Sequence, residues 1–202
     1  MRISNLKKHF GERLVPDLLV ELAKFDDTCD GESFSGYLEL DDFEGEPPCQ
    51  ALTGEEPEAL GGAGSAADKV LAMFAREGDG SMYALWFHDG VKDGNAPVVF
   101  IESEGSDDTA VIANDLQEFV SLLLMDIEEV GANYETFDGG RDEDEDHAEM
   151  HAEFVKWAKK RGISPASNAA EVVKAARARH PDFGQWMTGT WEALRGGDGQ
   201  ED

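Results

Sequence analysis

The spacing of apolar residues predicts helices near the N-terminus and then strands. Two sets of apolar residues recur at the spacing of a helix. The first set is Leu6 and Phe10, and the second is Leu18, Leu19, Leu22 and Phe25. Pro16 suits the first turn of the second helix. Residues 34–41 alternate between apolar and polar side chains, which is typical of a strand. Residues 44–66 are rich in Gly, Pro and Glu and indicate a loop.

Apolar runs in the middle of the chain predict an antiparallel sheet. Residues 70–75 and 82–87 flank a Gly-Asp-Gly turn, which is the pattern of a β-hairpin. A second turn-rich break leads to the run at 98–101, and residues 110–113 add a short strand. Successive strands with short connections pair antiparallel.

One long helix and three shorter ones are predicted after these strands. Residues 114–130 carry a single apolar stripe, and Asn114 with Gln117 suits a helix start. The shorter helices follow the acidic run at 142–146. Two of them begin with a similar pair of polar residues: Asn168 with Glu171, and Asp182 with Gln185.

The distribution of charge suggests how the chain is divided. Residues 1–154 hold nine basic and 38 acidic residues, whereas residues 155–195 hold eight basic and three acidic ones. Five adjacent carboxylates repel one another, so the acidic run is expected to be a linker. We therefore expect four parts: an α+β domain at 1–131, an acidic linker at 132–146, a helical extension at 147–195 and a disordered tail at 196–202.

The formal net charge of −27 narrows the classes of partner. Nucleic acids and anionic membranes require basic surfaces, so neither is expected as a partner. An acidic surface attracts basic proteins, although the same charge also serves solubility alone. The N-terminus lacks the apolar core of a signal peptide, and two cysteines form no metal or redox pattern. A reducing, cytoplasmic location is the expectation.

Three motifs suggest ligand or metal binding, and each lacks something that the binding requires. Residues 62–67 fit a loose dinucleotide-binding pattern, but no strand precedes them, which favours a flexible loop. Residues 142–153 match four acidic positions of an EF-hand, yet His147 stands where the turn requires glycine. His147 and His151 can share a metal across one helical turn, but without a third ligand we expect solvated histidines.

Catalytic residues are not evident from the sequence. There is no G-x-S-x-G motif, and Ser103 lies between carboxylates that would oppose an oxyanion. Acidic residues are so abundant that paired carboxylates carry no information. His88 follows an apolar run, and a structural hydrogen bond at a strand end is its expected role.

Three stretches in one order resemble the SUKH superfamily, whose bacterial members are mainly toxin-immunity proteins. These stretches are residues 80–90, 96–105 and 111–124, and residues 70–125 carry the resemblance as a whole. The resemblance implies an α+β fold with a bent antiparallel sheet packed by helices, followed here by an all-helical C-terminal extension. It implies neither catalysis nor a cofactor. Five residues match its fold-defining positions: Trp86, Pro97, Gly105, Leu116 and Phe119.

The resemblance and the charge together predict an immunity-type protein that binds and neutralises a basic toxin domain, with nucleases among the candidate toxins. The predicted contacts are acidic residues at strand ends and loops: Asp41, Asp42, Glu44, Glu102, Glu104, Asp107 and Asp108. Two alternatives stay open. One is a regulatory or scaffolding module with several partners, and the other is an enzyme or a Ca²⁺-responsive protein.

Overall fold

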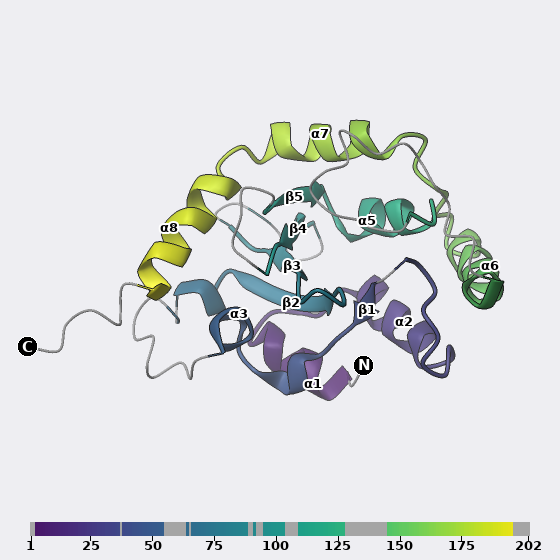
Figure 1. The fold of residues 1–202 in the computed structure, drawn as a ribbon, viewed down its shortest axis with the longest axis horizontal. Coiled ribbons are helices and arrows are strands. Elements are labelled where there is room, and N and C mark those ends of the chain that lie inside the picture. Colours follow the sequence, from purple (N-terminus) through teal and green to yellow (C-terminus); the bar gives the residue numbers. More distant parts are fainter. Residues whose placement is uncertain are drawn as a thin grey trace, which may run out of the picture.

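Five strands form one open antiparallel sheet in the computed structural model (Figure 1). The strands are β1 (Glu39–Leu40), β2 (Leu71–Arg76), β3 (Met82–Trp86), β4 (Val98–Ile101) and β5 (Ala110–Ala113). They lie in sequence order, and each pairs antiparallel with the next. The structure describes residues 3–36, 38–54, 64, 66–88, 91, 95–103, 109–127 and 145–195. The predicted α+β class is confirmed.

Both faces of the sheet are buried, because successive side chains of a strand point to opposite faces. In β3, Tyr83 and Leu85 belong to one apolar cluster, and Ala84 and Trp86 belong to the other. All five residues of this strand are buried. β3 and β4 are therefore continuous apolar runs, which is why the sequence pattern identified them.

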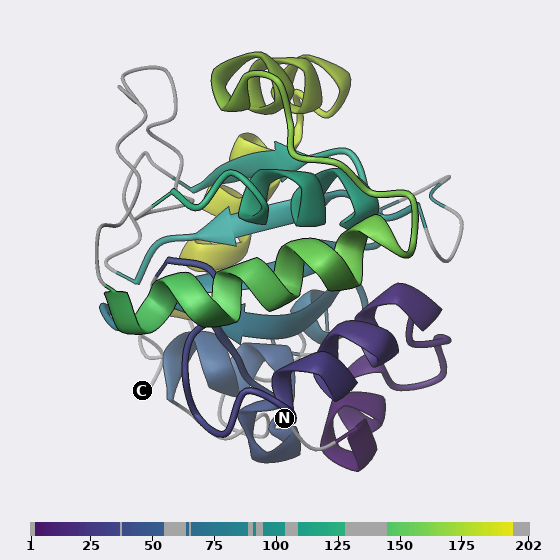
Figure 2. The ribbon, with the colours of Figure 1, turned by 90° about the vertical axis from the view of Figure 1, so that its right-hand side faces the viewer.

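Helices cover the two faces in separate groups (Figures 1 and 2). The first face carries α2 (Asp17–Asp26), α5 (Leu116–Leu123) and α6 (Glu145–Lys159), and the second carries α3 (Pro48–Thr53) and α8 (Phe183–Arg195). The helix α1 (Ile3–Phe10) lies beside β2 and a short 3₁₀ helix, η1 (Phe43–Gly45). Its two predicted apolar residues, Leu6 and Phe10, are fully buried.

A seventh helix, α7 (Ala169–Arg179), lies along the free edge of β5 (Figure 1). Asn168 caps this helix as predicted, because its side-chain oxygen accepts the Glu171 N–H at 3.1 Å. Ala169 and Val173 pack into the cluster on the first face, whereas Ala176 packs into the one on the second. The helix therefore closes the sheet at this edge and joins the two apolar layers.

Three predicted elements differ in the structure. The loop expected at 44–66 contains α3, in which Pro48 takes the first helical position and Cys49 and Leu52 are buried. The helix expected over 114–130 covers only eight residues, because the chain turns at Asp126, whose φ is +57°. Its cap is Asp115, which accepts the Glu118 N–H at 2.8 Å. The strand expected at 34–41 is reduced to β1.

The segment expected to be a helical extension packs into the same two apolar clusters as the sheet, and α7 and α8 contact β5 directly. Phe154, Trp157 and Ala158 of α6 belong to the apolar cluster of the first face, and Phe183 and Met187 of α8 belong to the other. Residues 132–144 of the expected linker lie outside the described residues. Its last two residues, 145 and 146, belong to α6, which begins at Glu145. The expected tail also lies outside them. Among the described helices, none is long and apolar enough to cross a bilayer.

Candidate functional site

Two of the predicted contact residues have structural hydrogen bonds. Asp41 follows β1, and its Oδ2 lies 2.6 Å from the Arg76 Nε. Its Oδ1 accepts the backbone N–H of Phe43 at 2.6 Å. The neighbouring Asp42 caps η1 by accepting the Glu44 N–H at 3.0 Å. Both side chains are half-buried, so they fix the path of the chain as it leaves the sheet.

Glu44 is the exposed member of this group. Its φ of +55° lies in the left-handed region, and its side chain borders an open hollow of about 510 Å³. Asp42 and two residues of α1, Asn5 and Lys8, line the rest of the hollow. The Asn5 Nδ2 donates to the Asp42 Oδ1 at 3.3 Å, which holds η1 against α1.

One of the remaining predicted contacts, Glu102, lies at the end of β4. Glu102 directly follows that strand and is half-buried, and its N–H donates to the Thr109 Oγ1 at 3.1 Å. Glu104, Asp107 and Asp108 lie outside the described residues. Three strand spacings, about 14 Å in all, separate β1 from β4. The four described residues therefore form two groups, and their role in partner binding stays a prediction.

Strand register places Glu102 at the same end of the sheet as acidic residues that the sequence analysis did not select. Glu39 pairs with Arg76 across β1 and β2, and Met82 pairs with both Arg76 and Ile101. The turn between β2 and β3 therefore lies at the same end of the sheet as Glu39 and Glu102. We call Glu39, Asp79 and Glu102 the acidic sheet end. The first two are exposed and the third is half-buried.

Hydrogen bonds hold the turn at the acidic sheet end in one conformation. The Asp79 carboxylate accepts the backbone N–H of Ser81 at 2.8 Å and its hydroxyl at 3.0 Å. The Ser81 Oγ in turn accepts the Ser103 N–H at 3.4 Å, which links the turn to the end of β4. Beneath the turn, the buried Tyr83 hydroxyl donates to the buried carboxylate of Glu77. The surface carboxylates are therefore presented by an ordered backbone.

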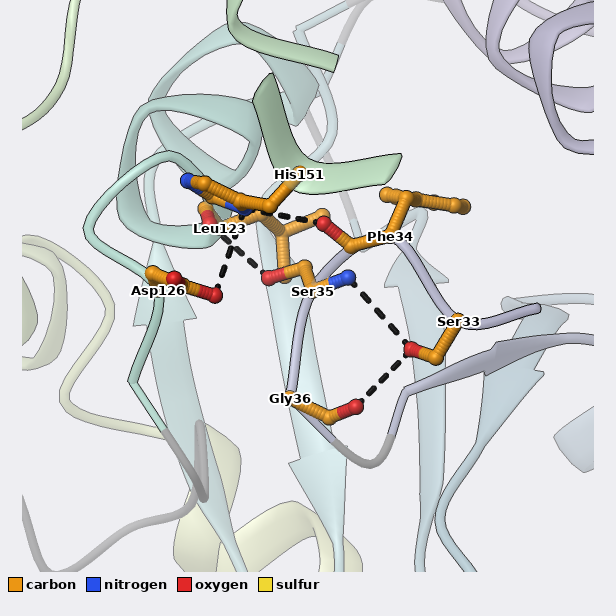
Figure 3. A network of polar contacts seen from close by, with 7 residues as sticks. All are labelled: Ser33, Phe34, Ser35, Gly36, Leu123, Asp126 and His151. Carbon is orange, nitrogen blue, oxygen red and sulfur yellow. Dashed lines mark hydrogen bonds and ion pairs between the residues drawn. The ribbon is translucent and has the colours of Figure 1, made fainter. Parts of the chain in front are cut away.

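A second cluster of polar groups is buried between α6 and the rest of the molecule (Figure 3). His151 of α6 is 5% exposed, and its Nδ1 lies 2.9 Å from the Phe34 carbonyl oxygen and 3.3 Å from the Asp126 Oδ1. The Ser35 hydroxyl donates to the Leu123 carbonyl at 2.8 Å. The expectation that His151 is a solvated residue is wrong, because the helix turns it toward the core.

This buried cluster contains a serine, a histidine and an aspartate, which are the residue types of hydrolytic triads. In such a triad, one imidazole nitrogen faces the aspartate and the other takes the proton of the serine hydroxyl. Here the hydroxyl of Ser35 is directed at a backbone carbonyl, and the serine is 1% exposed. The observed contacts connect the 33–36 loop, the end of α5 and α6, which is a structural role.

Cys49 and Cys29 are buried and free. The Cys49 thiol donates to the Asp68 Oδ2 at 3.3 Å. Burial, and then this hydrogen bond, raise the pKa of Cys49 to about 12. Burial, and then the nearby charge of Asp26, raise the pKa of Cys29 to about 11.

Both thiols are therefore expected to be unreactive in the native protein. The thiolate is the nucleophile, so at pH 8 the native chain should react with a chromogenic disulfide reagent about a hundredfold more slowly than the denatured chain. The denatured chain should release two equivalents of chromophore, one for each cysteine. A fast phase in the native protein would contradict this expectation.

The sequence analysis missed two residues of the acidic sheet end, and both were missed for the same reason. Glu39 and Asp79 are unremarkable in an acidic chain, and only strand pairing places them at the same end of the sheet as Glu102. The Gly-Asp-Gly turn was the available signal, since a hairpin brings the flanking strand ends together.

His88, expected at a strand end with a structural bond, lies just beyond β3 with its Nε2 3.2 Å from the His180 Nδ1. No family model, curated protein or solved structure matches the chain.

Proposed function

We propose that this protein functions by binding a basic protein through the acidic sheet end. The observation that carries the proposal is that Asp79 and Glu102 lie beside an ordered turn, with Glu39 farther along the same end of the sheet. Arg76 is a basic residue of this turn region, and its Nε lies 2.6 Å from the Asp41 Oδ2 and 4.0 Å from the Glu39 Oε2. Its charge is therefore partly offset within the protein.

The ordered backbone should increase the affinity for a partner, in addition to the effect of the charges that it carries. A surface that is already in its binding conformation loses less conformational entropy on association. Complementary charge increases the rate of encounter with a basic partner and disfavours acidic ones. Residues 1–154 hold 38 acidic and nine basic residues, so the field of this part of the molecule favours the same partners.

Within this class we favour an immunity-type role, in which a basic toxin domain is bound and neutralised in the cytoplasm. This choice rests on the resemblance of residues 70–125 to the SUKH superfamily and on the charge. Toxins that act on nucleic acids have basic surfaces for phosphate, and an acidic inhibitor can block such a surface. No catalytic step and no cofactor are part of the proposal.

A regulatory or scaffolding role is the second candidate, and one observation favours it. Exposed basic residues lie toward the C-terminal ends of α6 and α7: Lys156, Lys159, Lys160, Lys174 and Arg179. They give the C-terminal helices exposed basic groups of opposite charge to the acidic sheet end, although Lys156 is paired with Glu153. A protein with two regions of opposite charge can bind two kinds of partner.

Capture from the producing organism's lysate tests the proposal. The bait is compared with a triple variant, Glu39→Gln, Asp79→Asn and Glu102→Gln, at low and moderate salt. If charge speeds the encounter with a basic partner, loss of these three charges should slow association with that partner roughly tenfold. Added salt should reduce the difference in rate between the two baits, because it screens surface charge. The measurements are the identity of the captured proteins and the association rate with each of them.

A matched variant separates local from overall charge. Replacing Glu12, Glu149 and Glu192 with glutamine also removes three exposed carboxylates, but from α6, α8 and the end of α1. Capture of one basic protein by wild type and this control, but not by the first variant, supports the immunity-type role. Several unrelated partners favour scaffolding. Equal capture by both variants contradicts the proposed surface.

A further inference from the structure

Two histidines meet at the end of the sheet that lies opposite the acidic sheet end. His88 follows β3, and His180 follows the last residue of α7. The His88 Nε2 and the His180 Nδ1 are 3.2 Å apart, and the ring centroids are 5.2 Å apart. Both side chains are half-buried, so they remain accessible to water.

The relative placement of the rings matches two imidazoles that share one metal ion. Nitrogen ligands at about 2.0–2.1 Å from a tetrahedral Zn²⁺ lie about 3.3 Å from each other, and their ring centroids lie about 5.2 Å apart. The observed distances agree with this arrangement, and the same contact serves as an N–H···N hydrogen bond in the metal-free protein.

Surrounding groups hold the two rings in this position. His88 lies against the Trp86 indole, with ring centroids 4.2 Å apart, and Trp86 contacts Phe183 and Trp186 of α8. The backbone N–H of His180 donates to the Ala176 and Arg177 carbonyls at 3.1 and 3.2 Å, which places this residue directly at the end of α7.

We infer that His88 and His180 form a two-histidine site for a divalent transition metal such as Zn²⁺. Water completes the coordination, since no group of three or more metal-ligating side chains occurs among the described residues. The metal would join the end of β3 to the junction of α7 and α8. This goes beyond the proposed function, because it concerns the anchoring of the C-terminal helices and needs no partner.

Titration of the metal-free, full-length chain with Zn²⁺ tests the inference. We expect one binding event in calorimetry and a rise in Tm, because a ligand that binds only the folded state stabilises it. Glutamine in place of His88 and asparagine in place of His180 keep a polar atom near the same position, but they ligate Zn²⁺ poorly. His88→Gln and His180→Asn should each weaken binding more than tenfold.

Two controls make the result specific. His147→Gln removes the other candidate pair of histidines, which lies one turn apart in the sequence, and should leave the affinity unchanged. Ca²⁺, which prefers oxygen ligands, should not raise Tm through this site. No Zn²⁺ binding by the wild-type chain, or equal binding by His88→Gln and His180→Asn that retain a native circular dichroism spectrum, would overturn the inference.

Discussion

Replacing His151 with alanine is expected to lower the free energy of unfolding by about 3 kcal/mol. The imidazole is buried, and its Nδ1 contacts both the Phe34 carbonyl and the Asp126 carboxylate. Its removal leaves two buried acceptors with one partner fewer and opens a cavity beside Phe154, whose ring centroid lies 6.1 Å away. Urea denaturation followed by circular dichroism measures the effect.

Two further variants separate the contributions to this loss. Asp126→Asn keeps the size of the side chain, and asparagine tolerates the φ of +57° at this position. It should cost about 1–3 kcal/mol, which is the range for weakening one buried polar interaction. Lys156→Ala removes an exposed ion pair with Glu153 on the same helix and should cost less than about 1 kcal/mol. Equal losses for His151→Ala and Lys156→Ala would contradict a structural role for the buried cluster.

Replacing Phe154 with alanine is expected to cost about 3–5 kcal/mol, the range for removing a buried aromatic ring. Phe154 is fully buried, and three aromatic rings surround it at centroid distances of 4.7 Å (Phe34), 5.5 Å (Trp157) and 5.6 Å (Phe25). Two of these rings belong to the N-terminal part of the chain, so the loss should destabilise the whole molecule.

The shape of the unfolding curve tests that last point. If α6 folds together with the sheet, tryptophan fluorescence and circular dichroism should report one transition at the same denaturant concentration in both proteins. Val155→Ala is the matched control, because Val155 is adjacent on the helix and 36% exposed. It should change stability by less than about 1 kcal/mol. Separate transitions for α6 and the sheet would contradict a shared core.

The sequence predicted the central strands well because two independent signals agree there. The runs that became β3 and β4 are apolar on both faces, and glycine-rich turns flank them. The helix α3 was missed because Pro47, Pro48 and the following glutamates resemble a loop in composition. Proline is nevertheless well suited to the first position of a helix, and burial of Cys49 and Leu52 stabilises that short segment.

The candidate site was less predictable than the fold, because it depends on which strands are neighbours. Glu102 was selected from its place at a strand end, but its proximity to Asp79 follows from the pairing of Met82 with Ile101. His151 illustrates the same limit. Its neighbours along the chain are polar, and only the packing of α6 against the loop at 33–36 places it in the core.

The position of α7 restricts how a partner can be recognised. An open sheet commonly binds an extended peptide by strand addition, in which main-chain hydrogen bonds supply much of the affinity. Here α7 lies along β5, and the opposite edge strand, β1, is two residues long. In the part of the chain that the structure describes, neither edge offers a long template. Recognition must therefore depend on side chains, and a few surface substitutions can change which partner is bound.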